Sequence, residues 1–159
     1  MTIDAVIEIP LGSRNKYEVD KNDKTRIRLD RVLYSSVTYP AEYGFIENTL
    51  ADDGDALDIL VLSTSKTFPG CIVNARVLGY LKIIDQGKID NKIIAVPTGD
   101  PRYSEYNSID DIPPHTKDEI REFFNTYKDL QGIDIKVEDY YGLNEAIKVI
   151  NEAKENFTK

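Results

Sequence analysis

The chain has 159 residues and a formal net charge of −8, from 28 acidic and 20 basic side chains with one neutral histidine. This length is typical of one domain with its own hydrophobic core, so residues 1–159 are expected to form a single domain. The acidic balance argues against a nucleic-acid-binding surface, which needs a basic face. An acidic protein that binds an anion needs metal ions or a local cluster of Lys and Arg in its site.

The sequence also indicates the cellular compartment in which the protein is expected. The one cysteine, Cys71, cannot form an internal disulfide, and its apolar neighbours predict a buried core residue. No basic segment followed by an apolar run begins the sequence, and no stretch approaches the ~20 apolar residues of a membrane-spanning helix. We therefore expect a cytoplasmic protein with no membrane partner.

The first two thirds of the chain predict β-structure. Strands are expected at residues 6–9, 16–19, 26–32, 57–62, 71–84 and 93–96. Residues 16–19 and 26–32 alternate polar and apolar side chains, which predicts half-buried strands. Residues 57–62 are almost all apolar, which predicts a strand buried on both faces.

The last third predicts two helices. The first has apolar side chains at helical spacing, namely Ile120, Phe123, Phe124 and Tyr127. Thr116 and Glu119 fit a capping box at its start, and His115 is expected in the preceding loop. A short strand is expected at residues 133–137. The second helix is expected from Asn144, with Ala146, Val149, Ile150 and Ala153 facing inward. Strands followed by two helices predict a mainly β (α+β) fold, a small β-barrel with helices packed outside.

An acidic segment lies at the start of the most apolar predicted strand. Asp58 interrupts a run of core residues, and a buried carboxylate is costly unless a cation pairs with it. Mg²⁺ suits this role because hard cations prefer carboxylate oxygens. A solvated Asp-Gly turn is the alternative, and it explains Asp52, Asp53 and Gly54 better than it explains Asp58.

A second acidic pair, Asp85 and Asp90, lies in a polar stretch between two apolar strands. Residues 81–92 predict a β-hairpin. An ordinary polar hairpin turn explains their spacing at least as well as a metal site does.

Several segments together resemble one known family. Residues 53–59 read Asp-Gly-Asp-Ala-Leu-Asp-Ile and resemble the signature of soluble inorganic pyrophosphatases of the single-domain β-barrel (family I) type. Further segments agree in the same order, at residues 8–10, 16–18, 30–31, 39–44, 85–92 and 123–130. The likeness spans roughly residues 6–150. The chain departs from the family pattern in four ways. Ala56 replaces a usual proline, and Gln86 replaces a glutamate found in many members. Residues 131–133 lack a lysine that some members carry near the substrate, and the helix 116–128 lacks the histidines that some bacterial members use between subunits.

The resemblance implies a fold and an activity. The fold is an OB-like five-stranded barrel with helices packed outside. The activity is hydrolysis of inorganic pyrophosphate to two orthophosphates, by direct attack of Mg-activated water without a covalent intermediate. The cofactor is Mg²⁺, with several ions per site and other divalent ions able to substitute. The assembly is a homo-oligomer, expected to be a hexamer.

The resemblance also assigns roles to residues of this chain. The metal ligands are Asp53, Asp58, Asp85, Asp90 and Glu18, and Asp55 accepts the proton of the attacking water. The phosphate-binding residues are Lys16, Arg31, Tyr43, Lys92, Tyr127 and Lys128. Tyr39 and Glu8 support the site from behind. These residue types suit the reaction, because phosphoryl transfer depends on positioning and charge stabilisation.

Two other functions stay open on sequence grounds. One is a related hydrolase of polyphosphate or of a nucleoside triphosphate, although no Gly-rich phosphate loop or base-stacking pocket is evident. The other is a non-catalytic OB-type module that binds single-stranded nucleic acid. Its ten tyrosines could stack on bases, but the net charge opposes this function.

Overall fold

The computed structural model describes all of residues 1–159. Its strands are β1 (Thr2–Ile9), β2 (Asn15–Val19), β3 (Ile27–Val32), β4 (Glu42–Phe45), β5 (Asp58–Val61), β6 (Ile72–Asp85), β7 (Lys88–Ile89), β8 (Lys92–Pro97) and β9 (Ile135–Tyr141). Its helices are α1 (Pro114–Thr126) and α2 (Leu143–Thr158), with three short 3₁₀ turns at Pro101–Tyr103, Ile109–Asp111 and Asp129–Gln131.

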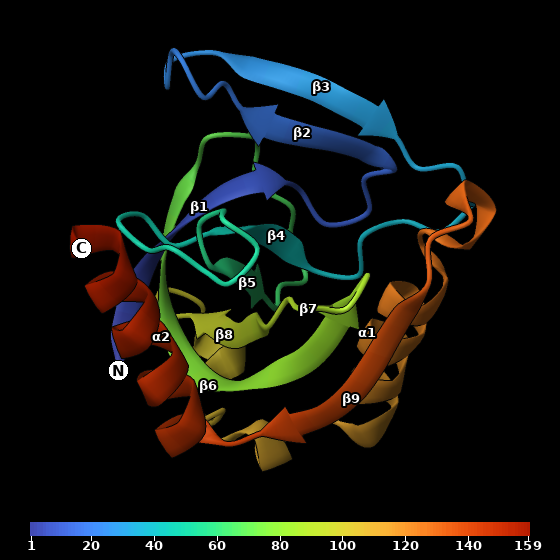
Figure 1. The fold of residues 1–159 in the computed structure, drawn as a ribbon. Coiled ribbons are helices and arrows are strands. Elements are labelled where there is room, and N and C mark those ends of the chain that lie inside the picture. Colours follow the sequence, from blue (N-terminus) through green and yellow to red (C-terminus); the bar gives the residue numbers. More distant parts are fainter.

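Five strands form a closed ring (Figure 1). They pair in the order β1-β4-β5-β8-β6, and β6 pairs back with β1. All of these pairs are antiparallel except β5 with β8. The long strand β6 also pairs with β7 and β9. The predicted fold class, mainly β with two helices packed outside a five-stranded barrel, is confirmed.

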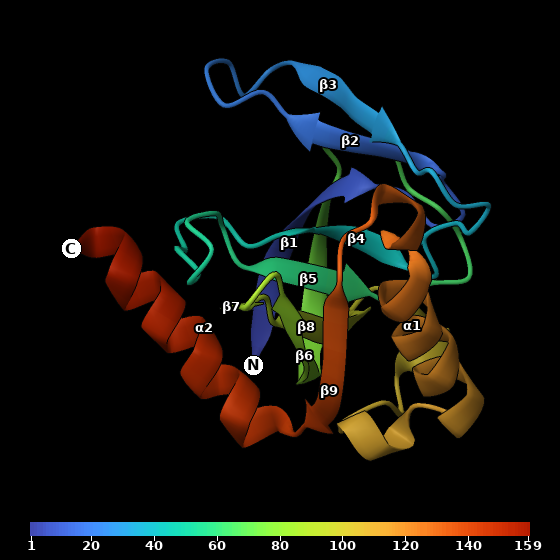
Figure 2. The ribbon, with the colours of Figure 1, turned by 45° about the vertical axis from the view of Figure 1, so that its right-hand side comes forward.

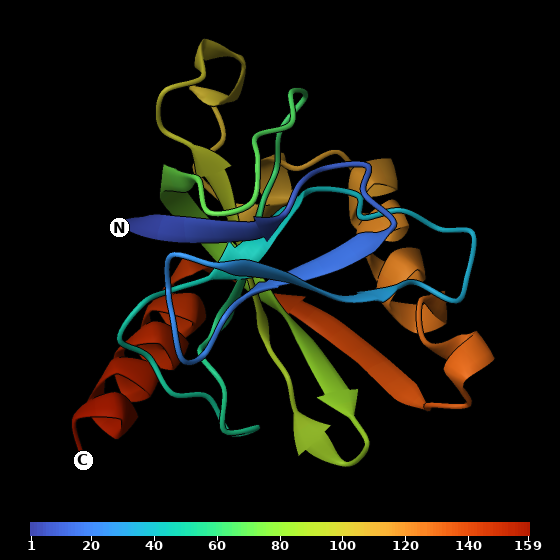
Figure 3. The ribbon, with the colours of Figure 1, turned by 90° about the horizontal axis from the view of Figure 1, so that it is seen from above.

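Strands β2 and β3 form a separate two-stranded sheet. Figure 1 shows this hairpin above β1, and Figure 3 shows it lying across the ring when the molecule is seen from above. The loop at residues 20–26 joins the two strands. The hairpin therefore forms a cover over one side of the ring.

The two helices lie on opposite sides of the ring (Figure 2). Helix α1 packs its Phe123 ring against Tyr39, with ring centroids 4.7 Å apart, and belongs to the larger apolar cluster. Helix α2 buries Ala146, Ile150 and Ala153 in a second cluster. Neither helix has the length and apolar content needed to cross a membrane.

The predicted strands are all present, but the sequence missed β4. Four residues give little pattern, and Gly44 at the centre of this strand weakens the β signal. The glycine is needed because a Cβ at this position would lie 1.9 Å from the carbonyl oxygen of Val6 on β1. The strand predicted at residues 133–137 is also displaced, since β9 spans Ile135–Tyr141.

The predicted capping box at Thr116 and Glu119 is wrong. Helix α1 begins at Pro114, follows Pro113 as its N-cap and has no side-chain cap. Proline is suited to the first turn of a helix because its fixed φ matches the helix and its missing N–H is not needed there. Thr116 and His115 therefore lie inside the first turn, and His115 is exposed rather than part of a loop.

Two expectations about burial are also wrong. The strand predicted at 26–32 was expected to bury its apolar face, yet Ile27, Leu29 and Val32 on β3 are exposed, because no further layer covers the hairpin. Cys71 is half-buried rather than a core residue, because it lies in the turn that precedes β6.

Candidate active site

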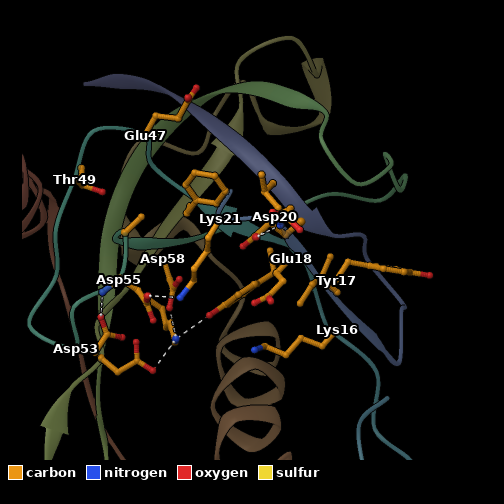
Figure 4. Close-up of a pocket in the computed structure, with 18 of the residues that line it drawn as sticks. Lys16, Tyr17, Glu18, Asp20, Lys21, Glu47, Thr49, Asp53, Asp55 and Asp58 are labelled. Carbon is orange, nitrogen blue, oxygen red and sulfur yellow. Dashed lines mark hydrogen bonds and ion pairs between the residues drawn. The ribbon is translucent and has the colours of Figure 1, made fainter. Parts of the chain in front are cut away.

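A cavity of about 550 Å³ opens between the β2–β3 hairpin, the acidic loop before β5 and the β6–β7 hairpin. Figure 4 shows side chains of β2 and of the acidic loop pointing into it. Every site residue predicted from the sequence lines this one cavity: Glu18, Asp53, Asp55, Asp58, Asp85 and Asp90, with Lys16, Arg31, Tyr43, Lys92, Tyr127 and Lys128. The fold thus brings both predicted sets together, while the role of each residue stays a prediction.

One wall of the cavity is acidic and is formed by Asp53, Asp55, Asp58, Asp85 and Asp90. Lys92 lies at the centre of this acidic wall. Its side chain is 2% exposed, and Nζ donates to Asp58 Oδ2 at 2.7 Å, to Asp90 Oδ2 at 2.9 Å and to the Tyr43 hydroxyl at 2.8 Å. The parallel pairing of β5 with β8 places Asp58 directly beside Lys92. Burial by itself lowers the pKa of Lys92, but the neighbouring groups Asp58, Tyr43 and Asp90 together outweigh this and raise the pKa well above its ordinary value. The ammonium therefore stays charged.

Three other carboxyl groups of this wall differ in pKa, because burial raises each pKa and neighbouring hydrogen bonds and charges oppose this to different extents. Burial raises the pKa of Asp53, and it raises the pKa of Asp90 in spite of Lys92. Burial acts in the same direction on Asp85, but the hydrogen bond from Lys128 Nζ at 2.7 Å, the charge of Lys128 and the hydrogen bond from Gln86 together hold the pKa of Asp85 below its ordinary value. Asp53 and Asp90 are thus carboxylates whose charge would be stabilised by a further cation.

The acidic loop folds as a tight turn before β5. Gly54 has φ of +86°, a left-handed conformation that favours glycine, and its N–H donates to the carbonyl of Ala51 at 3.0 Å. The Asp55 N–H donates to Asp53 Oδ1 at 3.1 Å. Ala56, at the position of the family proline, lies in this turn and lines the cavity. The turn thus presents Asp53 and Asp55 side by side.

The basic side of the cavity comes from the hairpin. Lys16 on β2 pairs in register with Arg31 on β3. Lys16 Nζ lies 2.9 Å from Asp30 Oδ2, and Arg31 Nε lies 3.4 Å from the same oxygen. Arg31 Nε is buried and makes no hydrogen bond. The guanidinium therefore has donors left for an anion, to which Arg can bind through two parallel hydrogen bonds.

Glu8 and Tyr39 were expected to support the site from behind. Glu8 lines the cavity and accepts a hydrogen bond from the Val19 N–H at 2.8 Å. Burial, together with the charge of Asp58, raises the pKa of Glu8 from 4.5 to about 7. Tyr39 does not line the cavity, but is buried against the Tyr43 ring with centroids 5.3 Å apart.

The sequence missed several polar residues of the cavity wall, namely Asp20, Lys21, Lys24, Glu47 and Asn48. Lys21 is the most notable, because its Nζ lies 3.5 Å from Asp55 Oδ1. In the sequence, residues 20–26 look like an ordinary polar turn on the surface. Only the folding of the hairpin across the ring brings this turn to the cavity.

The donor atoms fit a hard divalent cation. The predicted ligands are all carboxylates, which Mg²⁺ prefers over nitrogen or sulfur ligands. No three acidic, histidine or cysteine side chains converge closely enough to hold an ion in this arrangement, in which Lys92 stands between Asp58 and Asp90. Lys92 therefore occupies the space between two of the predicted ligands in this structure.

Comparison with known proteins shows the family of this chain. The family model described as inorganic pyrophosphatase matches residues 5–158. The chain belongs to the inorganic pyrophosphatase family. It is 56% identical over 150 residues to an inorganic pyrophosphatase of Halalkalibacterium halodurans, covering 94% of this chain and 91% of the relative. It is 53% identical to the enzyme of Geobacillus stearothermophilus, with 94% and 90% covered. As a family member the protein is an enzyme, an inorganic diphosphatase.

Solved pyrophosphatase structures share this fold. The Helicobacter pylori enzyme superposes with a TM-score of 0.95 at 42% identity, covering 99% of this chain and 94% of that one. The Thermus thermophilus enzyme also has a TM-score of 0.95, at 41% identity, with 99% and 92% covered. A truncated vacuolar soluble pyrophosphatase of Trypanosoma cruzi, solved in complex with PPi, has a TM-score of 0.90 at 25% identity, with 99% and 69% covered.

The raised pKa of Glu8 predicts a pH-dependent stability in the presence of EDTA. The folded chain holds the Glu8 proton more tightly than the unfolded chain, so the contribution of Glu8 to the free energy of unfolding falls as pH rises from 4.5 through about 7. Glu8→Gln keeps an acceptor for the Val19 N–H and removes this ionisation. We expect it to raise Tm by about 2–5 °C at pH 8 and to change it little at pH 5.

The control for this measurement is Glu47→Gln, which makes the same chemical change at an exposed position on the cavity rim. It is expected to shift Tm equally at the two pH values. An equal shift for Glu8→Gln at pH 5 and pH 8, measured by thermal unfolding, would contradict the raised pKa.

Proposed function

We propose that this pyrophosphatase hydrolyses inorganic pyrophosphate in the 550 Å³ cavity with Mg²⁺ as its cofactor. The observation that carries the proposal is the arrangement of charge around a single cavity. Six carboxylates on the acidic loop, the β6–β7 hairpin and β2 face four cationic side chains, Lys16, Arg31, Lys92 and Lys128. A substrate with several negative charges needs both groups. The cationic side chains contact it directly, and the carboxylates hold the metal ions that contact it.

In this proposal, Asp53, Asp58, Asp85, Asp90 and Glu18 hold the metal ions. When bound, Mg²⁺ lowers the pKa of a coordinated water and neutralises charge on the phosphoryl oxygens. The raised pKa values of Asp53 and Asp90 support this role, because a buried carboxylate with an unfavourable charge gains from a nearby cation. Other divalent ions of similar preference for oxygen can substitute.

The phosphate-binding residues are Lys16, Arg31, Tyr43, Lys92, Tyr127 and Lys128. Lys92 and Lys128 are now paired with carboxylates, so we infer that their ammonium groups turn to phosphoryl oxygens in the loaded site. Tyr43 and Tyr127 can donate hydrogen bonds without adding charge, and burial raises the pKa of both phenols, which keeps them protonated.

Asp55 is the proposed proton acceptor. Water attacks one phosphorus directly, the bond from that phosphorus to the bridging oxygen breaks, and its electron pair leaves with the second phosphate. The proton of the attacking water passes to Asp55. Thr49 is the only Ser or Thr that lines the cavity, and it is not free to replace water as the nucleophile. Its hydroxyl donates to the Ile46 carbonyl and accepts from the Leu57 N–H, so it is occupied as a structural group.

We also propose that residues 1–159 act as one domain, in the cytoplasm, within a homohexamer. A lone cysteine suits a reducing compartment. Exposed apolar side chains on the hairpin and near the start of β6 support self-association. Ile27 and Leu29 on β3 are exposed, Ile27 lies near Gly70, and Phe68 and Ile72, two residues before and after Gly70, are exposed as well. Exposed apolar surface commonly marks a contact between subunits.

The first test is phosphate release from pyrophosphate, measured with Mg²⁺ and with EDTA. We expect release only with the metal, and little release from ATP or a short polyphosphate under the same conditions. A folded sample that releases no phosphate from pyrophosphate across Mg²⁺ concentration and pH contradicts the proposed function. Faster release from ATP or polyphosphate would assign the protein to the related class of hydrolase.

The second test is Asp55→Asn. We expect kcat to fall by about 100-fold or more, because the proton acceptor is lost while the size of the side chain is kept. Mg²⁺ binding, measured by calorimetry, is expected to change little. The matched control is Asp52→Asn, an exposed neighbour outside the cavity wall, which should retain activity. An unchanged rate for Asp55→Asn would exclude this residue as the acceptor.

The third test concerns assembly. Light scattering coupled to size-exclusion chromatography is expected to give a mass about six times that of the chain. Leu29→Glu places a charge on the exposed apolar surface and is expected to lower this mass. A monomeric wild-type protein at micromolar concentration would contradict the hexamer. A wild-type mass retained by Leu29→Glu would show that the contact lies elsewhere.

A further inference from the structure

Three lysines of the cavity each contact a carboxylate of the acidic wall. The pairs are Lys92 with Asp58, Lys128 with Asp85 and Lys21 with Asp55. The first two lysines were predicted to bind phosphate, and the third was not. All three line the same cavity, so Lys21 occupies the same kind of position as the two predicted phosphate ligands.

The backbone around Lys21 is held firmly. The preceding Asp20 is buried, and its Oδ1 accepts hydrogen bonds from the N–H groups of Asn22 at 2.8 Å and Asp23 at 3.0 Å. Its other oxygen accepts from Arg28 Nε. The hairpin thus fixes the Cα of Lys21 at the edge of the cavity. From there the side chain extends inward to Asp55 (Figure 4).

The side chain of Lys21, in contrast, is held weakly. It is 78% exposed and the side chain of Asp55 is 65% exposed, with 3.5 Å between Nζ and Oδ1. Exposed pairs of this kind contribute little net stability. Lys92 and Lys128 are far more buried and lie 2.7 Å from their partners. Lys21 is therefore the cavity lysine that can change partner at the lowest cost.

We propose that Lys21 is a further pyrophosphate-binding residue, which leaves Asp55 and contacts a phosphoryl oxygen when the substrate enters. The proposal rests on the proposed function of the cavity. A phosphoryl oxygen is a better partner for the ammonium than the exposed carboxylate, because pyrophosphate carries several negative charges and forms strong charge-assisted hydrogen bonds. The same movement leaves the Asp55 carboxylate free to accept a hydrogen bond from the attacking water.

The test is Lys21→Gln, with Lys21→Arg as the conservative variant. We expect Lys21→Gln to raise KM for pyrophosphate about tenfold, with kcat changed less than about threefold, because one charge-assisted contact to the substrate is lost. Lys21→Arg should restore KM to within about twofold of the wild type. Raising ionic strength should weaken binding less steeply in Lys21→Gln than in the wild type.

A second measurement avoids turnover. Calorimetric titration with methylenediphosphonate, a non-hydrolysable analogue, in the presence of Mg²⁺ should give a Kd that rises with KM in Lys21→Gln. The matched control is Lys66→Gln, an exposed lysine on the loop between β5 and β6 that does not line the cavity. Its KM and Kd should equal those of the wild type. Thermal unfolding should be the same for all variants.

Each outcome decides the proposal. A rise in both KM and Kd for Lys21→Gln, with rescue by Lys21→Arg, supports it. Unchanged KM and Kd overturn it, as does a fall in kcat alone, which would mean that Lys21 acts only on Asp55. If the wild-type protein itself fails to hydrolyse pyrophosphate, the proposed function fails first, and the analogue titration still shows whether Lys21 binds a diphosphonate.

Discussion

The buried ammonium group of Lys92 is the constraint on which the site depends. A charge with 2% exposure must be paired, and its partners come from three different strands or turns: Asp58 on β5, Tyr43 on β4 and Asp90 beside the β6–β7 hairpin. The parallel pairing of β5 with β8 sets Asp58 next to it. Strands β4, β5 and β8 are neighbours in the ring, so their pairing brings these charged and polar groups together.

Much of this arrangement could be predicted from the sequence, because the strands and helices have clear periodicity and the site residues stand in recognisable short motifs. The remainder depends on tertiary placement. The short strand β4 carries Gly44, whose role is visible only when β1 approaches it. The apolar side chains of β3 alternate as a half-buried strand does, yet no layer of the same chain covers them. Lys21 lies in a turn with ordinary surface composition, and only the position of the hairpin over the ring gives it a place in the cavity.

The negative net charge of the molecule is consistent with the composition of the site. An overall charge of −8 does not by itself suit an anionic substrate, but many of the carboxylates line the cavity where metal ions are proposed to bind. Until those ions and the substrate bind, lysines neutralise the carboxylates locally. Gln86 adds to the stabilisation of the Asp85 charge. Its amide donates to Asp85 Oδ1 at 3.2 Å, a contact that the ionised glutamate of many family members could not donate.

The pairing of β1 with β6 has a consequence for biosynthesis. One edge of β1 pairs with β4, but the other pairs only with residues 72–76 of β6, and Lys128 of the cavity wall comes later still. As the chain leaves the ribosome, this second edge of β1 therefore stays unpaired for a long interval, which is a known route to misassembly. Such distant pairing also favours slow folding. A fragment that ends before α1 lacks Tyr127 and Lys128, so the complete cavity wall is present only near the end of synthesis.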